Sequence, residues 1–189
     1  MIILKQQQTE KELEISLRIK HFSMGNYDWS RFNVRIPVKS SIQQVYDAWT
    51  SPAALESWFL REAVFTSNAG EPVNNNSKIQ KGDHYTWHWY GYADDVPERG
   101  EILVANGHDY LRFSFGKAGI VNINISSESG ETVIDLVQEA IPTDDASRAS
   151  YHLGCSNGWT FYLANLKSFL EGGLDLRNKN EAHKNVINS

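Results

Sequence analysis

The amino-acid sequence predicts an α+β fold: a strand, two short helices, a six-stranded antiparallel meander and a long C-terminal helix. Three observations predict it. Apolar residues alternate along short segments separated by turn sequences, and sequential strands with tight connections pair as an antiparallel meander. Two short helical segments follow the first strand, and a long segment with helical apolar spacing comes last. Because an antiparallel sheet with one apolar face needs a cover, we expect the last helix to pack on it.

Length and composition are typical of one globular domain. The chain has 189 residues, of which 41% are hydrophobic and 12% aromatic. The formal net charge of -5 gives no bulk positive field for nucleic acid or anionic membranes. Cys155 is the single cysteine, which excludes an intrachain disulfide and a zinc site built from several thiolates. Three apolar residues follow Met1, too few for a signal peptide or a membrane span, so we expect a cytoplasmic protein.

The sequence divides into three parts. Residues 1–29 are predicted to form a polar N-terminal extension, residues 30–176 the globular domain, and residues 177–189 a polar C-terminal tail. Within the extension, apolar residues alternate over 13–19, which predicts an additional edge strand.

Strand period and helix capping signals specify the first elements of the domain. Apolar residues alternate over 32–38, which predicts a strand with one buried face. Ser40 or Ser41 then caps a helix that has apolar residues at helical spacing from Ile42 onward. Pro52 suits the first turn of a second short helix.

The middle of the chain alternates apolar segments with turn sequences rich in Gly, Asn, Asp and Ser. We expect strands at 62–66, 83–91, 99–105, 110–116, 119–126 and 131–139. A long helix over 147–171 follows, and Gly172 and Gly173 end it. The apolar stripe of this helix consists of Cys155, Trp159, Tyr162, Leu166, Phe169 and Leu170.

The segment HYTWHWYGY, residues 84–92, is dense in aromatic rings and suggests a metal site, a nucleic-acid stacking platform or the wall of an apolar pocket. At strand period, His84 and His88 share a face but lie about 13 Å apart, so they cannot chelate one ion together. Acidic residues outnumber the single Arg99 across 83–101, which opposes stacking of nucleic acid. The apolar pocket is therefore the favoured interpretation.

The inner face of the predicted sheet is rich in aromatic side chains. We expect Tyr85, Trp87 and Trp89 to point toward the helix, beside Phe113 and Phe115 of a later strand. Inward rings fill a core by default, so this pattern fits both a solid core and a pocket.

Two glycines in the predicted C-terminal helix favour a pocket. Gly154 and Gly158 precede Trp159, and each costs about 1 kcal/mol relative to alanine inside a helix. They remove side-chain volume from the first half of the helix, either for close packing on the sheet or for a ligand.

Polar side chains inside a pocket would orient a ligand. Gln138 follows apolar residues at period two and should face inward, while His152 and Cys155 lie one helical turn apart. They could form a nucleophilic pair, but a lone buried cysteine is more often an inert small hydrophobe. We assign no catalytic or metal-binding residue. The predicted ligand-binding residues are Trp58, Tyr85, Trp87, Trp89, Phe113, Phe115, Gln138, His152, Cys155 and Trp159.

Four segments resemble a known family. VRIPVKSSIQQVYDAWTSPAALESWF at 34–59 is similar to the start of the START-like helix-grip domains, the SRPBCC superfamily, and to the group named after the activator of heat-shock-protein-90 ATPase. GEILVAN at 100–106, YLRFSFG at 110–116 and GWTFYLANLKSFLEGG at 158–173 resemble later landmarks of that group. The resemblance covers 30–176 and implies an antiparallel sheet wrapped around the C-terminal helix, with a deep, mostly apolar cavity between them.

We favour non-enzymatic binding of a small apolar or aromatic molecule in this cavity. The resemblance implies two alternatives: a protein that regulates a chaperone ATPase, with the chaperone as partner, and an enzyme like the polyketide cyclases or hydrolases of the wider superfamily. We expect no cofactor, no nucleic-acid partner and no membrane span. The sequence does not specify the oligomeric state or the identity of the ligand.

Overall fold

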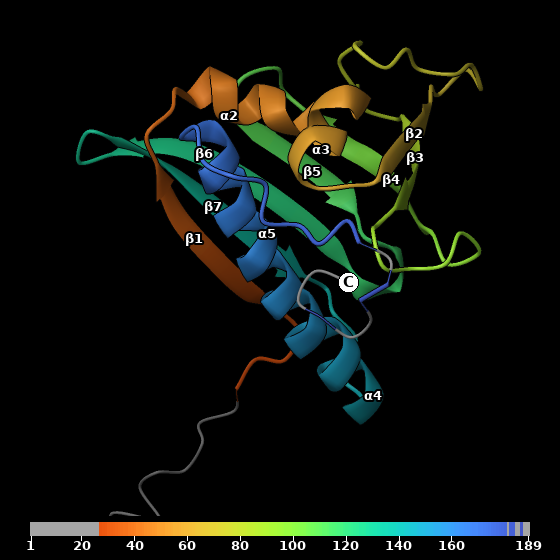
Figure 1. The fold of residues 1–189 in the computed structure, drawn as a ribbon. Coiled ribbons are helices and arrows are strands. Elements are labelled where there is room, and N and C mark those ends of the chain that lie inside the picture. The colour runs from red at the N-terminus through yellow and green to blue at the C-terminus, as the bar shows by residue number, and fades with distance from the viewer. Residues whose placement is uncertain (1–26, 181, 184–185, 187–189) are drawn as a thin grey trace, which may run out of the picture.

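The computed structural model describes residues 27–180, 182–183 and 186, so the predicted edge strand at 13–19 lies outside the described residues. Within them, seven strands form one antiparallel sheet in the order β1-β7-β6-β5-β4-β3-β2 (Figure 1). The strands are β1 (Phe32–Val38), β2 (Glu62–Thr66), β3 (His84–His88), β4 (Glu98–Ala105), β5 (Tyr110–Ser114), β6 (Ile120–Glu128) and β7 (Glu131–Glu139). The predicted α+β meander is confirmed, with β1 paired to β7.

The helices follow the predicted order. They are α2 (Ile42–Trp49), α3 (Pro52–Trp58), the one-turn α4 (Asp145–Ser147), the π-helical segment η2 (Arg148–Gly154) and α5 (Cys155–Leu170). A 3-10 turn, η1 (Gly116–Ala118), links β5 to β6. Along the described ranges, no helix combines the length and apolar character that crossing a bilayer requires.

The short helices begin at the predicted caps. The Ser41 hydroxyl accepts a hydrogen bond from the Gln44 amide, and the Gln44 side chain accepts one from the Ser41 amide, which completes a capping box. Ser51 caps α3, and Pro52 occupies its first turn. Both helix starts are therefore specified by local chemistry.

The third strand is shorter than predicted. We expect it to run to residue 91, but β3 ends at His88, and Trp89 lies beyond the ladder. Gly91 has a φ of +83°, a conformation that favours glycine and turns the chain away from the sheet. Residues 89–97 instead form the connection between β3 and β4.

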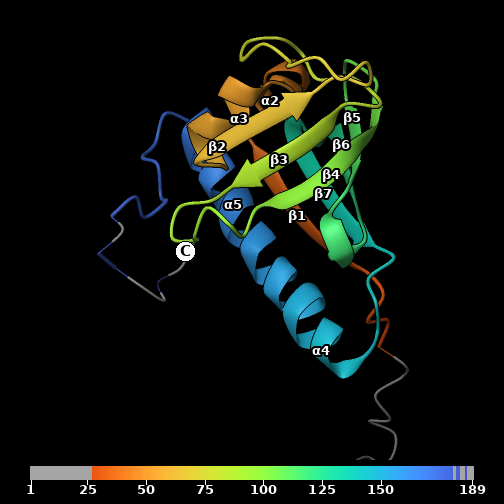
Figure 2. The ribbon, with the colours of Figure 1, turned by 90° about the vertical axis from the view of Figure 1, so that its right-hand side faces the viewer.

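Helix α5 lies across one face of the curved sheet, with α2 and α3 beside it (Figures 1 and 2). Its buried surface is wider than one stripe, because it packs against both β1 and α3. Trp159 and Leu166 are buried as predicted, but Leu163 and Asn165 are buried too. Phe169, which the predicted stripe includes, is 44% exposed.

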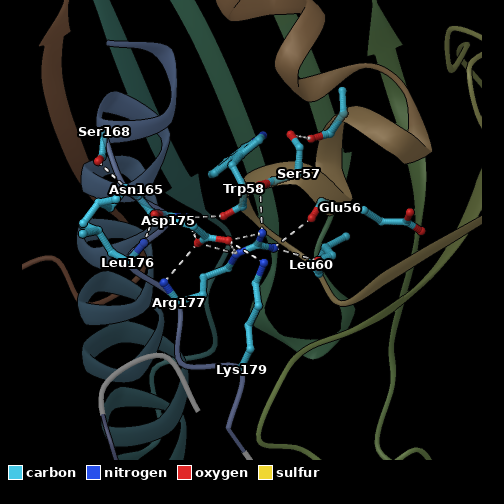
Figure 3. Close-up of polar contacts among 12 residues, drawn as sticks. Glu56, Ser57, Trp58, Leu60, Asn165, Ser168, Asp175, Leu176, Arg177 and Lys179 are labelled. Carbon is cyan, nitrogen blue, oxygen red and sulfur yellow. Dashed lines mark hydrogen bonds and ion pairs between the residues drawn. The ribbon is translucent and has the colours of Figure 1, made fainter. Parts of the chain in front are cut away.

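The C-terminal segment packs against the end of α3 through Arg177, which sequence analysis places in the polar tail. The Arg177 side chain is 1% exposed. Its guanidinium donates hydrogen bonds to the carbonyl oxygens of Glu56 at 3.0 Å, Ser57 at 2.8 Å and Leu60 at 2.8 Å (Figure 3). These are the free carbonyls of a helix C-terminus, where a cation is favoured. The segment that they hold in place includes Phe59.

Asn165 and Asp175 complete this arrangement, which we call the C-terminal clamp (Asn165, Asp175 and Arg177; Figure 3). Asn165 donates to the Trp58 carbonyl and accepts from the Leu176 amide, so the buried amide ties α5 to α3 and to the tail. The Asp175 carboxylate pairs with Arg177 at 2.7 Å. Burial opposes ionisation of Asp175, but the hydrogen bonds from Arg177 and Lys179 outweigh it and hold the pKa of Asp175 well below its usual range.

Candidate functional site

A cleft of about 550 Å³ lies between the first half of α5 and the connection 89–97. Figure 2 shows these two segments side by side. Its volume is in the range of small-molecule sites in proteins. The cleft is open to solvent on one side. It is lined by Phe59, Trp89, Tyr92, Val96, Pro97, Glu98, Phe115, Ser150, Gly154, Cys155, Asn157, Gly158, Trp159, Phe161, Tyr162 and Val186.

Aromatic rings from four parts of the fold form the walls of the cleft. Phe115 and Trp159 have ring centroids 5.4 Å apart, and Phe59 meets Tyr162 edge-on at 4.8 Å. Trp89 contacts Phe59 at 5.7 Å from the other side. Because each ring also packs on the core behind it, the walls are rigid and present apolar surface to any occupant.

Four of the predicted site residues line the cleft: Trp89, Phe115, Cys155 and Trp159. They come from the β3–β4 connection, the residue that follows β5, and the first turns of α5. The fold thus brings together residues that are 70 positions apart in sequence, from 89 to 159.

Four other predicted residues lie behind the cleft, in the core. Trp58, Trp87 and Phe113 are at most 1% exposed, and Tyr85 stacks on Trp87 with ring centroids 3.8 Å apart. The Trp58 indole donates to the Ala48 carbonyl. These four rings are therefore part of the packed core, and the open volume lies beside the first half of α5.

Gln138 lies one layer below the cleft and supports its wall. Its side chain donates to the Ala118 carbonyl at 2.8 Å and accepts from the Trp159 indole at 2.7 Å. Its side chain also acts to lower the pKa of the Cys155 thiol. Because a fully buried amide needs all these partners, Gln138 determines the orientation of Trp159.

His152 is buried but does not line the cleft. Its Nε2 lies 2.8 Å from the Tyr27 hydroxyl, and its Nδ1 lies 2.9 Å from the Trp29 carbonyl oxygen. Both ring nitrogens thus have partners other than Cys155. Burial raises the pKa of Cys155, with Glu98 adding to the shift and the Gln138 hydrogen bond opposing it. The Cys–His pair considered from sequence is not assembled, and the thiol is not activated.

The two helix glycines border the cleft rather than a tight helix–sheet contact. Apart from chain neighbours and the adjacent helix backbone, a Cβ atom at Gly158 would meet no atom of the described residues within 4 Å, and one at Gly154 would meet only the Ala149 carbonyl at 3.6 Å. Close packing therefore does not require glycine at either position. Of the two explanations that the sequence leaves open, the structure favours open space beside the helix.

Glu98 is a cleft residue that sequence analysis misses. Its position in the charged turn ADDVPERG suggests a solvent-exposed side chain, and the predicted strand begins one residue later. In the structure Glu98 is the first residue of β4 and pairs in register with Trp87, so both side chains lie on the inner face. Strand period counted back from the buried Ile102 gives the same face, and this signal is present in the sequence.

The Glu98 carboxylate sits against the backbone of Gly116. Gly116 has a φ of +46°, and a Cβ atom there would clash with the carboxylate. Burial raises the pKa of Glu98, while the hydrogen bond from the Arg99 amide and the charge of Arg99 oppose the shift. Glu98 in turn raises the pKa values of Tyr85 and Cys155, in both cases after burial as the larger cause.

Glu98→Gln is expected to raise the thermal unfolding midpoint at pH 7. The raised pKa means that the folded protein binds this proton more tightly than the unfolded chain does, so ionisation of Glu98 destabilises the fold as pH rises above about 4.3. The gain should shrink toward pH 4, where wild-type Glu98 is protonated. Tyr85 and Cys155 stay neutral throughout this interval. Calorimetry at pH 4 and pH 7 provides the measurement; a variant less stable than wild type at pH 7 would contradict the expectation.

Comparison with known proteins identifies the fold. The family model described as Activator of Hsp90 ATPase homolog 1-like protein matches residues 39–171. No curated protein matches the sequence.

Solved structures agree with the family match. The Aha1 dimer from Colwellia psychrerythraea is 14% identical, with a TM-score of 0.57 over 76% of this chain and 97% of that chain. Protein SSP2350 from Staphylococcus saprophyticus is 18% identical, with a TM-score of 0.59 over 78% and 96%. DynU16, from the dynemicin biosynthetic locus, is 18% identical, with a TM-score of 0.57 over 79% and 50%. These likenesses confirm the predicted helix-grip fold.

Proposed function

This chain belongs to the family of Activator of Hsp90 ATPase homolog 1-like proteins, and we propose that it binds a small apolar or aromatic molecule in the cleft without transforming it. The observation that carries the proposal is the open space at Gly158, in a cleft whose lining includes seven aromatic residues. Glycine lowers the stability of a helix relative to alanine, and at this position close packing does not explain its presence. A ligand that occupies the space beside Gly158 would explain it.

The chemistry of the lining supports binding rather than catalysis. Cys155 is a thiol with a raised pKa, and His152 is engaged elsewhere. Ser150 and Asn157 are exposed at the rim of the cleft, and no base among the described residues is hydrogen-bonded to them. The aromatic walls bury apolar surface of an occupant, which contributes about 25 cal/mol for each Å² removed from water.

Binding is tested with N-phenyl-1-naphthylamine, an uncharged probe whose fluorescence rises in apolar surroundings. Wild-type protein should bind it saturably. Gly158→Phe places a benzyl group in the open space and should weaken binding by about tenfold or more, because it displaces apolar contact area. Fluorescence titration gives both dissociation constants.

Thr160→Phe is the matched control, because Thr160 is an exposed residue of α5 that does not line the cleft. It adds the same ring to the same helix and should leave probe affinity unchanged. Thermal unfolding of both variants excludes loss of fold as the cause. Equal probe affinity in wild type and Gly158→Phe would contradict the proposed site.

Regulation of a chaperone ATPase is the second candidate function, and the description of the family favours it. Such regulation would act through an exposed surface rather than through the cleft. An Hsp90 ATPase assay with wild type and Gly158→Phe separates the two functions. A rate change that both proteins produce equally would support the second function, while an unchanged rate would rule it out.

A further inference from the structure

We propose that the ligand of the cleft is a hydrophobic amine, whose ammonium group pairs with the Glu98 carboxylate while its apolar part contacts the aromatic walls. This inference rests on the proposed function and specifies the chemical class of the ligand. It follows from the charge of the lining, from the unpaired state of Glu98 and from the rings around it.

Among the described residues, the lining of the cleft has one charged side chain. Among the described residues that border the cleft, Glu98 is the only ionisable carboxylate, and none is a lysine, arginine or histidine. A fatty acid or another anion would therefore find no cation there and would face the negative charge of Glu98. The ligand charge that complements this lining is positive.

The charge of Arg99 acts on Glu98, but no cation forms a salt bridge with its carboxylate within the described part of the chain. Its carboxylate accepts a hydrogen bond from the neighbouring Arg99 amide at 3.0 Å, and it forms no salt bridge there. The Arg99 side chain borders a separate depression with His84 and Thr86 on the outer face of the sheet. A neutral ligand would cover the carboxylate and leave its charge unpaired, which is costly in an apolar site. An ammonium group would pair with it.

The aromatic walls also favour a cation. Trp89, Phe115 and Trp159 border the cleft together with Glu98, and the faces of such rings attract an ammonium group within about 6 Å. Gly116 holds the carboxylate in place, because the carboxylate occupies the position that a side chain would take there. The negative group is thus fixed beside apolar rings, an arrangement that matches a molecule with one basic group and one apolar part.

Three ligands with the same ring system test the inference: 1-naphthylmethylamine, 1-naphthalenemethanol and 1-naphthoate. Each is titrated against wild type by calorimetry at pH 7. The amine should bind about tenfold more tightly than the alcohol, the difference expected for a hydrogen bond to a charged group, and the carboxylate should bind most weakly.

Glu98→Gln preserves the shape of the side chain and removes its charge. The affinity of the amine for this variant should be about tenfold lower than for wild type, while the affinity of the alcohol should be unchanged. Glu101→Gln is the control, because it removes the same charge from the same strand outside the cleft lining. It should leave all three affinities unchanged.

The outcomes separate the two proposals. Equal affinities of amine and alcohol in wild type would overturn the amine inference and leave cleft binding intact. Tighter binding of 1-naphthoate than of the amine would also overturn the amine inference and leave cleft binding intact. If no naphthalene compound binds and N-phenyl-1-naphthylamine does not bind either, the proposed function fails and the inference fails with it. The comparison of amine and alcohol affinities in wild type tests the amine inference even if Glu98→Gln does not fold.

Discussion

Arg177→Ala is expected to lower the free energy of unfolding by about 3–5 kcal/mol, the largest effect among the substitutions considered. The side chain is 1% exposed and donates to three backbone carbonyls and to Asp175. Alanine would leave those carbonyls without their donor and the Asp175 carboxylate without its buried partner. Urea denaturation at pH 7, followed by tryptophan fluorescence, measures the loss.

Lys179→Ala is the matched control for the clamp. Lys179 pairs with the same Asp175 carboxylate at 2.8 Å, but its side chain is 49% exposed, so its removal should cost at most about 1 kcal/mol. Arg177→Lys should fall between the two, because one ammonium group cannot reproduce the planar set of donors. If Arg177→Ala and Lys179→Ala cost the same, the clamp does not hold α3 against the C-terminal segment.

Gly100→Ala is expected to lower the free energy of unfolding by about 2–3 kcal/mol, at the upper end for an overpacked site. The Tyr85 hydroxyl crosses β4 at Gly100 to donate to the Ser114 carbonyl at 2.6 Å. A Cβ atom at Gly100 would lie 2.5 Å from that hydroxyl oxygen and would also clash with the carbonyl. Since no atom can approach that closely, β4 or Tyr85 would have to move.

Gly158→Ala makes the same chemical change with the opposite expected sign. It should raise the free energy of unfolding by about 0.5–1 kcal/mol, because alanine favours the helix and its Cβ would meet no described atom within 4 Å outside the adjacent helix backbone. Urea denaturation of both variants under identical conditions gives the comparison. A destabilised Gly158→Ala would mean that the space beside the helix is not open, which would remove the main support for a bound ligand.

Much of the architecture can be predicted from the chain, because its signals are local. Alternating apolar residues define β2 and β7 with the observed boundaries, and Ser41 and Pro52 mark the helix starts. The boundaries of the strand at 84–88 are predicted less accurately. The alternation of aromatic residues continues past the point where Gly91 turns the chain away, so periodicity alone extends the strand too far.

The candidate site is only partly predictable. Period two correctly places Trp87 and Phe113 on the inner face, but whether an inward ring fills the core or borders open space depends on its neighbours from other elements. Glu98 belongs to a charged turn in the sequence, which predicts exposure, but its side chain borders the cleft in the structure. Asn165 and Arg177 are polar residues whose burial no local pattern indicates.

Local chemistry by itself specifies the elements, their order and the family resemblance of this protein, because periodicity, caps and turn residues act over a few neighbouring positions. Packing between distant segments decides where the cleft lies, that Glu98 borders it without a salt bridge to any described residue, and that Arg177 is buried at the end of α3. The physical reason is that burial and electrostatic environment depend on contacts between residues far apart in the chain, which no short stretch of sequence contains.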